Sequence, residues 1–319
     1  MITLQAVCSM TSHRRQLVIA AATATALAAA VLLSACGGNG GNGSSPTNAG
    51  AANGSQGGNA GQGGQSGNAG RNASASQYDP SNFGDPATGA NQWLPLKPGV
   101  QWTREGTVNA GNRTLTHQVV STVTDVSKPV DGVRTVIVLD QDTNGGQIAE
   151  QSLDYEAEDK HGNVWYLGSY TESYEGGQFV NASDAWLAGI NGSKPGILMQ
   201  ADPKPGNSFT EDTVPGIEAP SAQVVKSGQS QCVPFRCFKD ALVVQEGSEY
   251  KYYAPGVGQI LTEPQTSGGK QEVEKLVNVT QLSASGLARI SAEVVKLDKH
   301  AQVTAPDVFG NAPVAKRSL

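Results

Sequence analysis

Between residues 91 and 282, apolar residues recur mostly at every second position, and turn residues interrupt the pattern at short intervals. A period of two is the spacing of side chains on one face of a β-strand. Residues 133–139 are rich in β-branched side chains, 142–147 form a glycine-rich turn, and 148–157 return to alternation. No long helical pattern separates the strands, which disfavours a parallel sheet. The sequence therefore predicts a mainly β fold, either a single antiparallel curved sheet or an incomplete β-barrel.

A stripe with helical spacing follows at the C-terminus, formed by Leu287, Ile290, Val294 and Leu297. Ser285 precedes it as a candidate N-cap. This pattern predicts a C-terminal helix and tail over residues 283–319, with the chain loose from Pro306 onward. Three prolines between residues 194 and 206 predict a long loop there, because proline interrupts a sheet.

Residues 37–76 contain only Gly, Asn, Ser, Ala, Gln, Thr, one Pro and Arg71. Such a segment has no large apolar side chains with which to form a core, so it is expected to be disordered. Forty residues of this kind behave as a coil spanning roughly 35 Å. We interpret residues 36–90 as a tether.

Residues 1–35 have the layout of an export signal. Arg14 and Arg15 precede an uncharged apolar run over residues 17–33, and small residues follow it. The segment Leu33-Ser34-Ala35-Cys36 resembles the lipobox of bacterial lipoprotein signals. This resemblance implies cleavage before Cys36, lipidation of its thiol, and a location in the bacterial cell envelope. The protein would then be anchored to the plasma or outer membrane and face the extracytoplasmic side.

Two alternatives remain for this leader. The apolar run is at the short end for a spanning helix, so a retained anchor is one of them. The other is an ordinary secretory signal that leaves Cys36 free. Met10 is an alternative start, because residues 1–9 add nothing that a signal needs.

The charge of the chain bears on its partners. Removing residues 1–35 takes away two arginines and no acid, which changes the formal net charge from −6 to −8. Nucleic-acid binding needs clustered Lys and Arg, so no nucleic acid is expected as a partner. No polybasic stretch is present for anionic lipid either, so the acyl chains must anchor the protein.

Cys232 and Cys237 are the two cysteines left after Cys8 and Cys36. In an oxidising compartment after export, a structural disulfide between them is expected. A redox-active pair is the alternative, but the spacing is not C-x-x-C.

Residues 140–145 match the first half of an EF-hand calcium loop, with oxygens from Asp140, Asp142 and Asn144. The second half fails, because position 12 is Gln151 where a bidentate Glu is needed. A hairpin turn explains the segment better, so we expect no metal and keep calcium as a weak alternative.

The sequence contains no nucleophile elbow, phosphate-binding loop or dinucleotide fingerprint, so it indicates no cofactor. Asp154 and Glu156 share one face of a strand, and we interpret them as a solvated acidic face in preference to a catalytic pair. Catalytic groups need only meet in space, so whether the protein is an enzyme stays open, with the balance against it.

Aromatic residues in or beside the strands are the remaining clue. They either fill the core or line a groove for an apolar ligand. The candidates for the groove are Trp102, Trp165, Tyr166, Trp186, Tyr252 and Tyr253.

Several motifs together resemble a group of uncharacterised bacterial lipoproteins. They are Leu96-Lys97-Pro98-Gly99 with Trp102 and Glu105-Gly106, DKHGNVWYLG at 159–168, KPGILMQAD at 194–202, and YYAPGVG at 252–258. The resemblance covers most of residues 93–282 and implies a location and a fold, but no reaction. The last motif is also similar, locally, to envelope proteins with a LolA-like half-barrel, which hold lipids or lipoproteins.

These observations favour a tethered, non-enzymatic binding or scaffold protein, with a lipid or another apolar ligand. The alternatives are a tethered hydrolase acting on envelope material and a pure protein-interaction module. A binder should have an apolar cavity, whereas a hydrolase should gather carboxylates or a histidine in one cleft.

Overall fold

A computed structural model describes residues 77–110, 113–266 and 273–318. The predicted leader, the lipidation site Cys36 and most of the predicted tether lie outside these residues. Within the described ranges, no helix is long and apolar enough to cross a membrane.

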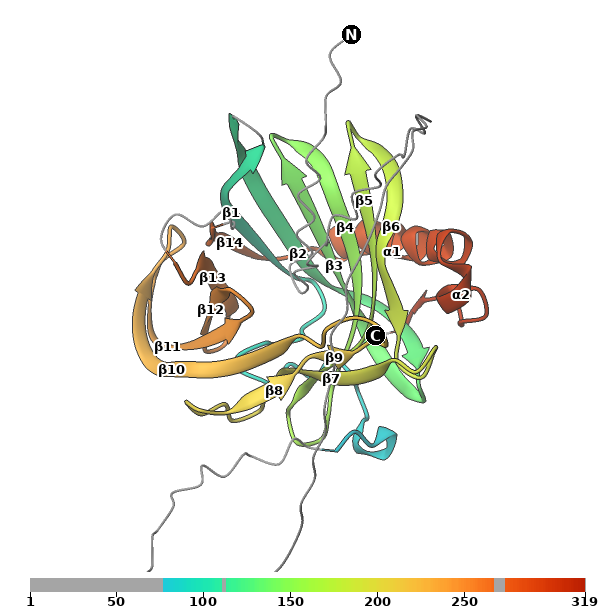
Figure 1. The fold of residues 1–319 in the computed structure, drawn as a ribbon, viewed down its shortest axis with the longest axis horizontal. Coiled ribbons are helices and arrows are strands. Elements are labelled where there is room, and N and C mark those ends of the chain that lie inside the picture. Colours follow the sequence, from blue (N-terminus) through green and yellow to red (C-terminus); the bar gives the residue numbers. More distant parts are fainter. Residues whose placement is uncertain (1–76, 111–112, 267–272, 319) are drawn as a thin grey trace, which may run out of the picture. The chain divides into compact units, whose positions relative to one another are not determined.

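The described chain forms fifteen strands, two α-helices and a short 3₁₀ helix at Pro80–Asn82 (Figure 1). The helices are α1 (Ala284–Thr304) and α2 (Pro306–Phe309). The strands are β1 (Val100–Ala110), β2 (Arg113–Val130), β3 (Val133–Asn144), β4 (Gln147–Glu158), β5 (Val164–Glu175), β6 (Gln178–Leu187), β7 (Lys194–Met199), β8 (Ser208–Thr210), β9 (Asp212–Thr213), β10 (Ser221–Cys232), β11 (Cys237–Glu246), β12 (Glu249–Ala254), β13 (Gly258–Pro264), β14 (Val273–Gln281) and β15 (Lys316–Arg317).

All strand pairs are antiparallel, and two meanders make up the sheet. Strands β1 to β5 follow one another in space, β10 to β14 do the same, and β1 pairs with β14 to join them. The sheet curves into a nearly closed barrel, which confirms the predicted antiparallel fold with a C-terminal helix (Figure 1). Two-residue turns such as Asp131-Gly132, both at positive φ, connect neighbouring strands tightly.

The two ends of the sheet come close to each other at β7, β8 and β9, which nearly closes the barrel. β9 pairs with β7 while β8 pairs with β10, and only Glu211 separates β8 from β9. The prediction of a long loop over residues 194–206 was therefore wrong in part. Residues 194–199 form β7, because Pro195 lies at the end of the strand, where it pairs with Asp212 on the short strand β9.

Gly196 lies where β7 passes the backbone of β8 and β9. A Cβ atom at this position would lie 2.2 Å from Thr210 O and 2.5 Å from Glu211 O. Both contacts are with backbone atoms, which can give way only if the strands move apart. The absence of a side chain at residue 196 therefore permits the close approach of the strands that nearly close the barrel.

We expect Gly196→Ala to lower the free energy of unfolding by about 1–3 kcal/mol, the usual cost of overpacking. Gly84→Ala is the matched control, because a Cβ there would meet no atom within 4 Å. Its effect should stay within about 0.5 kcal/mol. Urea unfolding followed by circular dichroism measures both, and equal stability of the two variants would contradict this account of closure.

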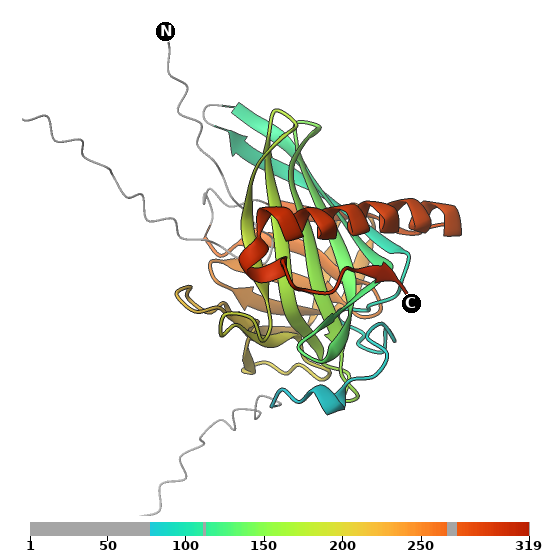
Figure 2. The same ribbon diagram turned by 90° about the vertical axis from the view of Figure 1, so that its right-hand side faces the viewer.

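Helix α1 crosses the outer face of the sheet, as the red helix in Figure 2 shows. Ser283 caps its N-terminus by accepting from Gly286 N, two residues before the predicted cap. Val294, Leu297 and Ala301 are buried against the sheet, so the predicted stripe faces it in part.

Asp298 is the buried polar centre of this contact. Its carboxylate lies 2.8 Å from Lys128 Nζ on β2 and accepts from Tyr155 OH on β4, also at 2.8 Å. The other oxygen accepts from Ala315 N. Burial lowers the pKa of Lys128, and Asp298 offsets this only in part. Burial together with Asp298 raises the pKa of Tyr155 well above its usual value.

The tail after Pro306 is packed, so the prediction of a loose end was wrong. Phe309 is buried, with its ring 5.9 Å from the ring of Tyr155 and 5.6 Å from that of Tyr170. Strand β15 pairs with β2. Sequence periodicity does not reveal such contacts, because they join segments far apart along the chain.

The packed chain also begins before the predicted boundary at residue 91. The rings of Tyr78 and Phe83 lie 5.6 Å and 6.0 Å from that of Trp165. Phe83 forms a bridge with Asp159, and Glu158 N donates to Pro86 O. Residues from Gln77 onward are therefore part of the domain.

Cys232 and Cys237 are joined by a disulfide, as expected from the sequence. The two residues are directly paired at the ends of β10 and β11. The guanidinium of Arg236, in the turn that the disulfide closes, lies 5.5 Å and 4.7 Å from the ring centroids of Phe235 and Phe238.

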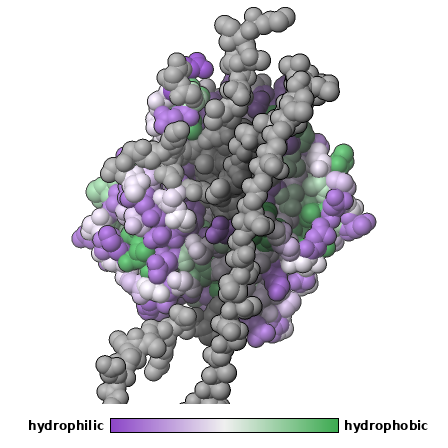
Figure 3. Space-filling view, viewed as in Figure 1, coloured by the Kyte–Doolittle hydropathy of each residue, from purple (hydrophilic) through white to green (hydrophobic). Residues whose placement is uncertain are grey.

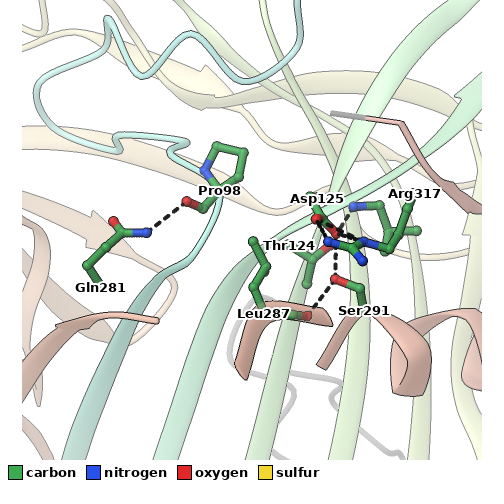
Figure 4. Close-up of polar contacts among 8 residues, drawn as sticks. Pro98, Thr124, Asp125, Gln281, Leu287, Ser291 and Arg317 are labelled. Atoms are coloured by element: carbon green, nitrogen blue, oxygen red, sulfur yellow. Dashed lines mark hydrogen bonds and ion pairs between the residues drawn. The ribbon is translucent and has the colours of Figure 1, made fainter. Parts of the chain in front are cut away.

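A second polar contact fixes α1 and the tail to β2 (Figure 4). Asp125 receives hydrogen bonds from Ser291 Oγ at 2.6 Å and from Arg317 Nε at 2.9 Å. Burial raises the pKa of Asp125, but the bonds from Arg317 and Ser291 outweigh it and bring the pKa below its ordinary value of 3.8.

A carboxyl group whose pKa is lowered on folding stabilises the fold above its unfolded pKa, and this contribution is lost as pH falls through the folded pKa. We therefore expect Asp125→Asn to cost about 1 kcal/mol at pH 7. The variant should lose less stability than the parent below about pH 4. Urea unfolding at pH 7, 5 and 3 measures this, with the exposed Asp307→Asn as control. Parallel losses in parent and variant would contradict the assignment.

Candidate binding pocket inside the barrel

The position of α1 on the outside of the sheet shows which side chains point into the barrel. Because Tyr155 points outward to the helix, its neighbours Asp154 and Glu156 on β4 point inward. Residues directly opposite each other on neighbouring strands share one face of the sheet. Asp154 lies opposite Val138 on β3, and Val138 lies opposite Val123 on β2, so these residues also point inward. Inner positions on the other strands are obtained in the same way.

Many of these inner positions carry buried polar side chains, and carboxylates are the commonest among them. The predicted solvated acidic face was wrong, because Asp154 and Glu156 are buried. Buried carboxylates outnumber the buried basic side chains, Arg104, His117 and Lys251, on this face, which makes the lumen acidic overall. The buried polar inner residues include Arg104, His117, Ser121, Asp140, Asp142, Glu150, Ser152, Asp154, Glu156, Ser169, Thr171, Asp184, Lys251 and Glu274.

A pocket with a cavity of about 40 Å³ lies against β1 to β4. One part of its wall is apolar and the other carries charged and polar side chains. Segment 94–96 and the start of β13 complete the wall. The lining consists of Leu94, Leu96, Trp102, Arg104, Ser121, Val123, Val138, Asp140, Glu156, Gly258 and Gln259.

Trp102 is held in the wall of this pocket by the turn between β12 and β13. Its indole Nε1 donates to Val257 O at 2.6 Å. The next residue, Gly258, has a φ of +103°, and a Cβ there would lie 3.7 Å from the indole ring. The YYAPGVG motif at 252–258 thus positions the aromatic wall of the pocket.

Arg104 begins a line of polar contacts along the inner face. Its Nη2 donates to Ser121 Oγ at 2.5 Å, and its Nε lies 3.5 Å from Glu274 Oε2. Glu274 Oε1 lies 3.7 Å from His117 Nε2, and His117 Nδ1 is 2.7 Å from Asn144 Oδ1. The guanidinium charge is thus neutralised locally by Glu274.

Asp140 carries a buried polar atom without a hydrogen-bond partner in the described structure, and Arg104 Nε is another in the same lining. Asp140 is 6 % exposed, and the atom without a partner is its Oδ1. It lies directly opposite Ser121 on one side and Ser152 on the other. A buried carboxylate oxygen without a donor is costly, so a ligand that supplies a donor would be stabilised here.

Of the six aromatic residues predicted for a groove, Trp102 alone is among the described residues that line this pocket. Trp165 packs outside the barrel and donates to Asp159 Oδ2 at 2.8 Å. Tyr166 and Trp186 pack edge to face, with ring centroids 5.2 Å apart. Tyr252 donates to Glu263 and Tyr253 is buried.

The weak calcium alternative concerned Asp140, Asp142 and Asn144. All three lie on the inner face of β3, which continues to Asn144, so the segment is a strand and not an EF-hand loop. Among the described residues, no group of three or more His, Cys, Asp or Glu side chains is arranged to hold a metal ion.

Sequence reasoning missed Arg104, Ser121 and Glu156 as residues of a shared pocket. A signal was present in 150–157, where polar residues alternate with Leu153, Tyr155 and Ala157. Alternation shows that two faces differ, but it does not show that the polar face is enclosed.

Exposed large apolar side chains are scattered over several elements and include Phe179, Val180, Ile217 and Val303. Where the coloured surface is visible in Figure 3, hydrophilic residues predominate and hydrophobic ones form small separate areas. This view therefore gives no support for a broad apolar docking face.

No family model and no curated protein matches this sequence. Solved structures that match include a protein described as exported, with a YmcC-like fold, from Bacteroides fragilis NCTC 9343. It is 14% identical, with 60% of this chain and 99% of that chain covered and a TM-score of 0.33. Another is a protein described as a lipoprotein from Parabacteroides distasonis ATCC 8503, at 13% identity, 59% and 97% coverage and a TM-score of 0.33.

Proposed function

We propose that this chain is an envelope lipoprotein, anchored through Cys36, that binds a small ligand in the barrel pocket without transforming it. The anchor is supported by the two arginines, the apolar run and the lipobox-like residues before Cys36. The long tether lets the domain reach away from the membrane surface. The binding role rests on one observation, the buried and unpartnered oxygen of Asp140 in a pocket that also has an apolar wall.

A tethered hydrolase is the second candidate, because Asp140 and Glu156 line the same pocket. Asp140 lies opposite Ser152, and Glu156 lies four residues further along β4. Four residues of a strand span about 13 Å. Paired carboxylates in glycoside hydrolysis are about 5–9.5 Å apart, so the register weighs against Asp140 and Glu156 as such a pair. Asp154 and Glu156, two residues apart on the inner face of β4, lie about 7 Å apart along the strand and are the pair to test.

The anchor is tested by Cys36→Ser. We expect the variant to leave the detergent phase in a Triton X-114 partition, because lipidation requires the thiol. Cys8→Ser is the matched control and should partition like the parent, since Cys8 precedes the predicted cleavage site. A Cys36→Ser protein that stays as firmly membrane-bound as the parent would show that the leader is a retained helix.

The binding role is tested with protein extracted gently from its own membrane. Native mass spectrometry should detect a bound small molecule in the parent. Val138→Phe places a ring in the pocket and should reduce the bound fraction at least tenfold, while the exposed Val180→Phe should not. Val138→Ile, a smaller change, serves if the first variant is unstable.

The remaining outcomes separate the alternatives. No bound molecule in the parent would favour the protein-interaction module. Conversion of the bound molecule over time in the parent, but not in Glu156→Gln, would favour the hydrolase.

A further inference from the structure

We propose that the barrel pocket selects a primary ammonium group carried on an apolar chain. The inference rests on the proposed binding function and names the ligand class for the same pocket. It follows from the acceptor at Asp140, the charge balance of the lining, and the size and wall of the cavity.

The first step is the acceptor. An ionised carboxylate only accepts hydrogen bonds, and Asp140 Oδ1 has no donor within the described structure. A ligand that fits must therefore bring an N–H or O–H group to this oxygen. A cationic donor binds an ionised carboxylate more strongly than a neutral one does, because the attraction between opposite charges adds to the hydrogen bond.

The second step is the charge balance. The lining holds two carboxylates, Asp140 and Glu156, and one guanidinium, Arg104. Arg104 lies 3.5 Å from Glu274 and donates to Ser121, so Glu274 balances its charge, although its Nε has no acceptor at hydrogen-bond distance among the described residues. The inner carboxylates nearby add to the negative potential, which excludes a carboxylate or phosphate ligand at Asp140.

The third step is the kind of cation. No group of three or more potential ligand side chains is placed for a metal ion in the described ranges, which favours an organic cation. The cavity of about 40 Å³ has room for a compact ammonium head group, and an attached chain must extend beyond it along the open side of the pocket. The apolar wall, with Leu96, Trp102 and Val123, can contact an attached alkyl chain.

The test compares n-hexylamine, n-hexanol and hexanoate, which share one chain length and differ in the head group. Binding to the membrane-extracted protein is measured at pH 7 by tryptophan fluorescence and by the shift in thermal unfolding. Empty detergent micelles give the baseline. We expect hexylamine to bind about tenfold or more tightly than hexanol, the gain from the attraction between opposite charges, and hexanoate to bind weakest.

Asp140→Asn keeps the shape of the side chain and removes its charge. It should reduce the preference for hexylamine over hexanol to threefold or less. Glu105→Gln is the matched control, because this exposed acid follows Arg104 on β1 and points to the other face. It should behave as the parent does.

Equal binding of hexylamine and hexanol by the parent would overturn the ammonium inference and leave the binding function in place. Preference for hexanoate would also overturn it and would make Arg104 the selecting charge. If no probe binds although mass spectrometry finds a bound molecule, the ammonium class is wrong but the pocket is still a binding site. If neither experiment finds binding, both proposals fail. Should Asp140→Asn not fold, Glu156→Gln gives the second test and should also lower the preference for the amine.

Discussion

Burial on both faces of strands β2 to β5 is the constraint on which the rest of the structure depends. The outer face is covered by α1 and the tail, and the inner face is enclosed by the barrel. Neighbouring residues on one strand therefore meet different surroundings although neither is exposed. Tyr155 lies under the helix beside Asp298, while Glu156 lines the pocket. The packing of the outer layer, which is apolar around the two polar contacts at Asp298 and Asp125, stabilises the sheet, and the inner layer can then carry charge.

The outer layer is organised around one buried carboxylate. Asp298 joins helix α1 to β2 through Lys128, to β4 through Tyr155 and to the tail through Ala315. Removing one partner of a buried ion pair leaves an uncompensated charge, which is far more costly than losing a surface pair. The helix, the sheet and the last residues of the chain therefore depend on one another, and the tail is packed for this reason.

The sequence sufficed for the strands, the antiparallel order and the helix, because these follow from local periodicity. It also sufficed for the disulfide between Cys232 and Cys237, since only two cysteines remained for an exported domain. Prediction from the sequence failed where the deciding contact joins segments far apart along the chain. The packing of Tyr78 on Trp165, the pairing of β7 with β9, and the enclosure of Glu156 all depend on segments far away along the chain. The pocket could not be predicted from the sequence for the same reason, because its lining comes from distant segments.

The pocket shows how stability and binding oppose each other in this fold. Val138 and Asp140 lie two residues apart on the same inner face of β3, and both line the cavity. A second valine at the position of Asp140 would remove a buried acceptor without a partner, which costs about 1–3 kcal/mol when left unpaired. Stability alone therefore favours an apolar residue there. The double layer around β2 to β5 is strong enough to tolerate the carboxylate, and a donor brought by a ligand would turn its cost into binding energy.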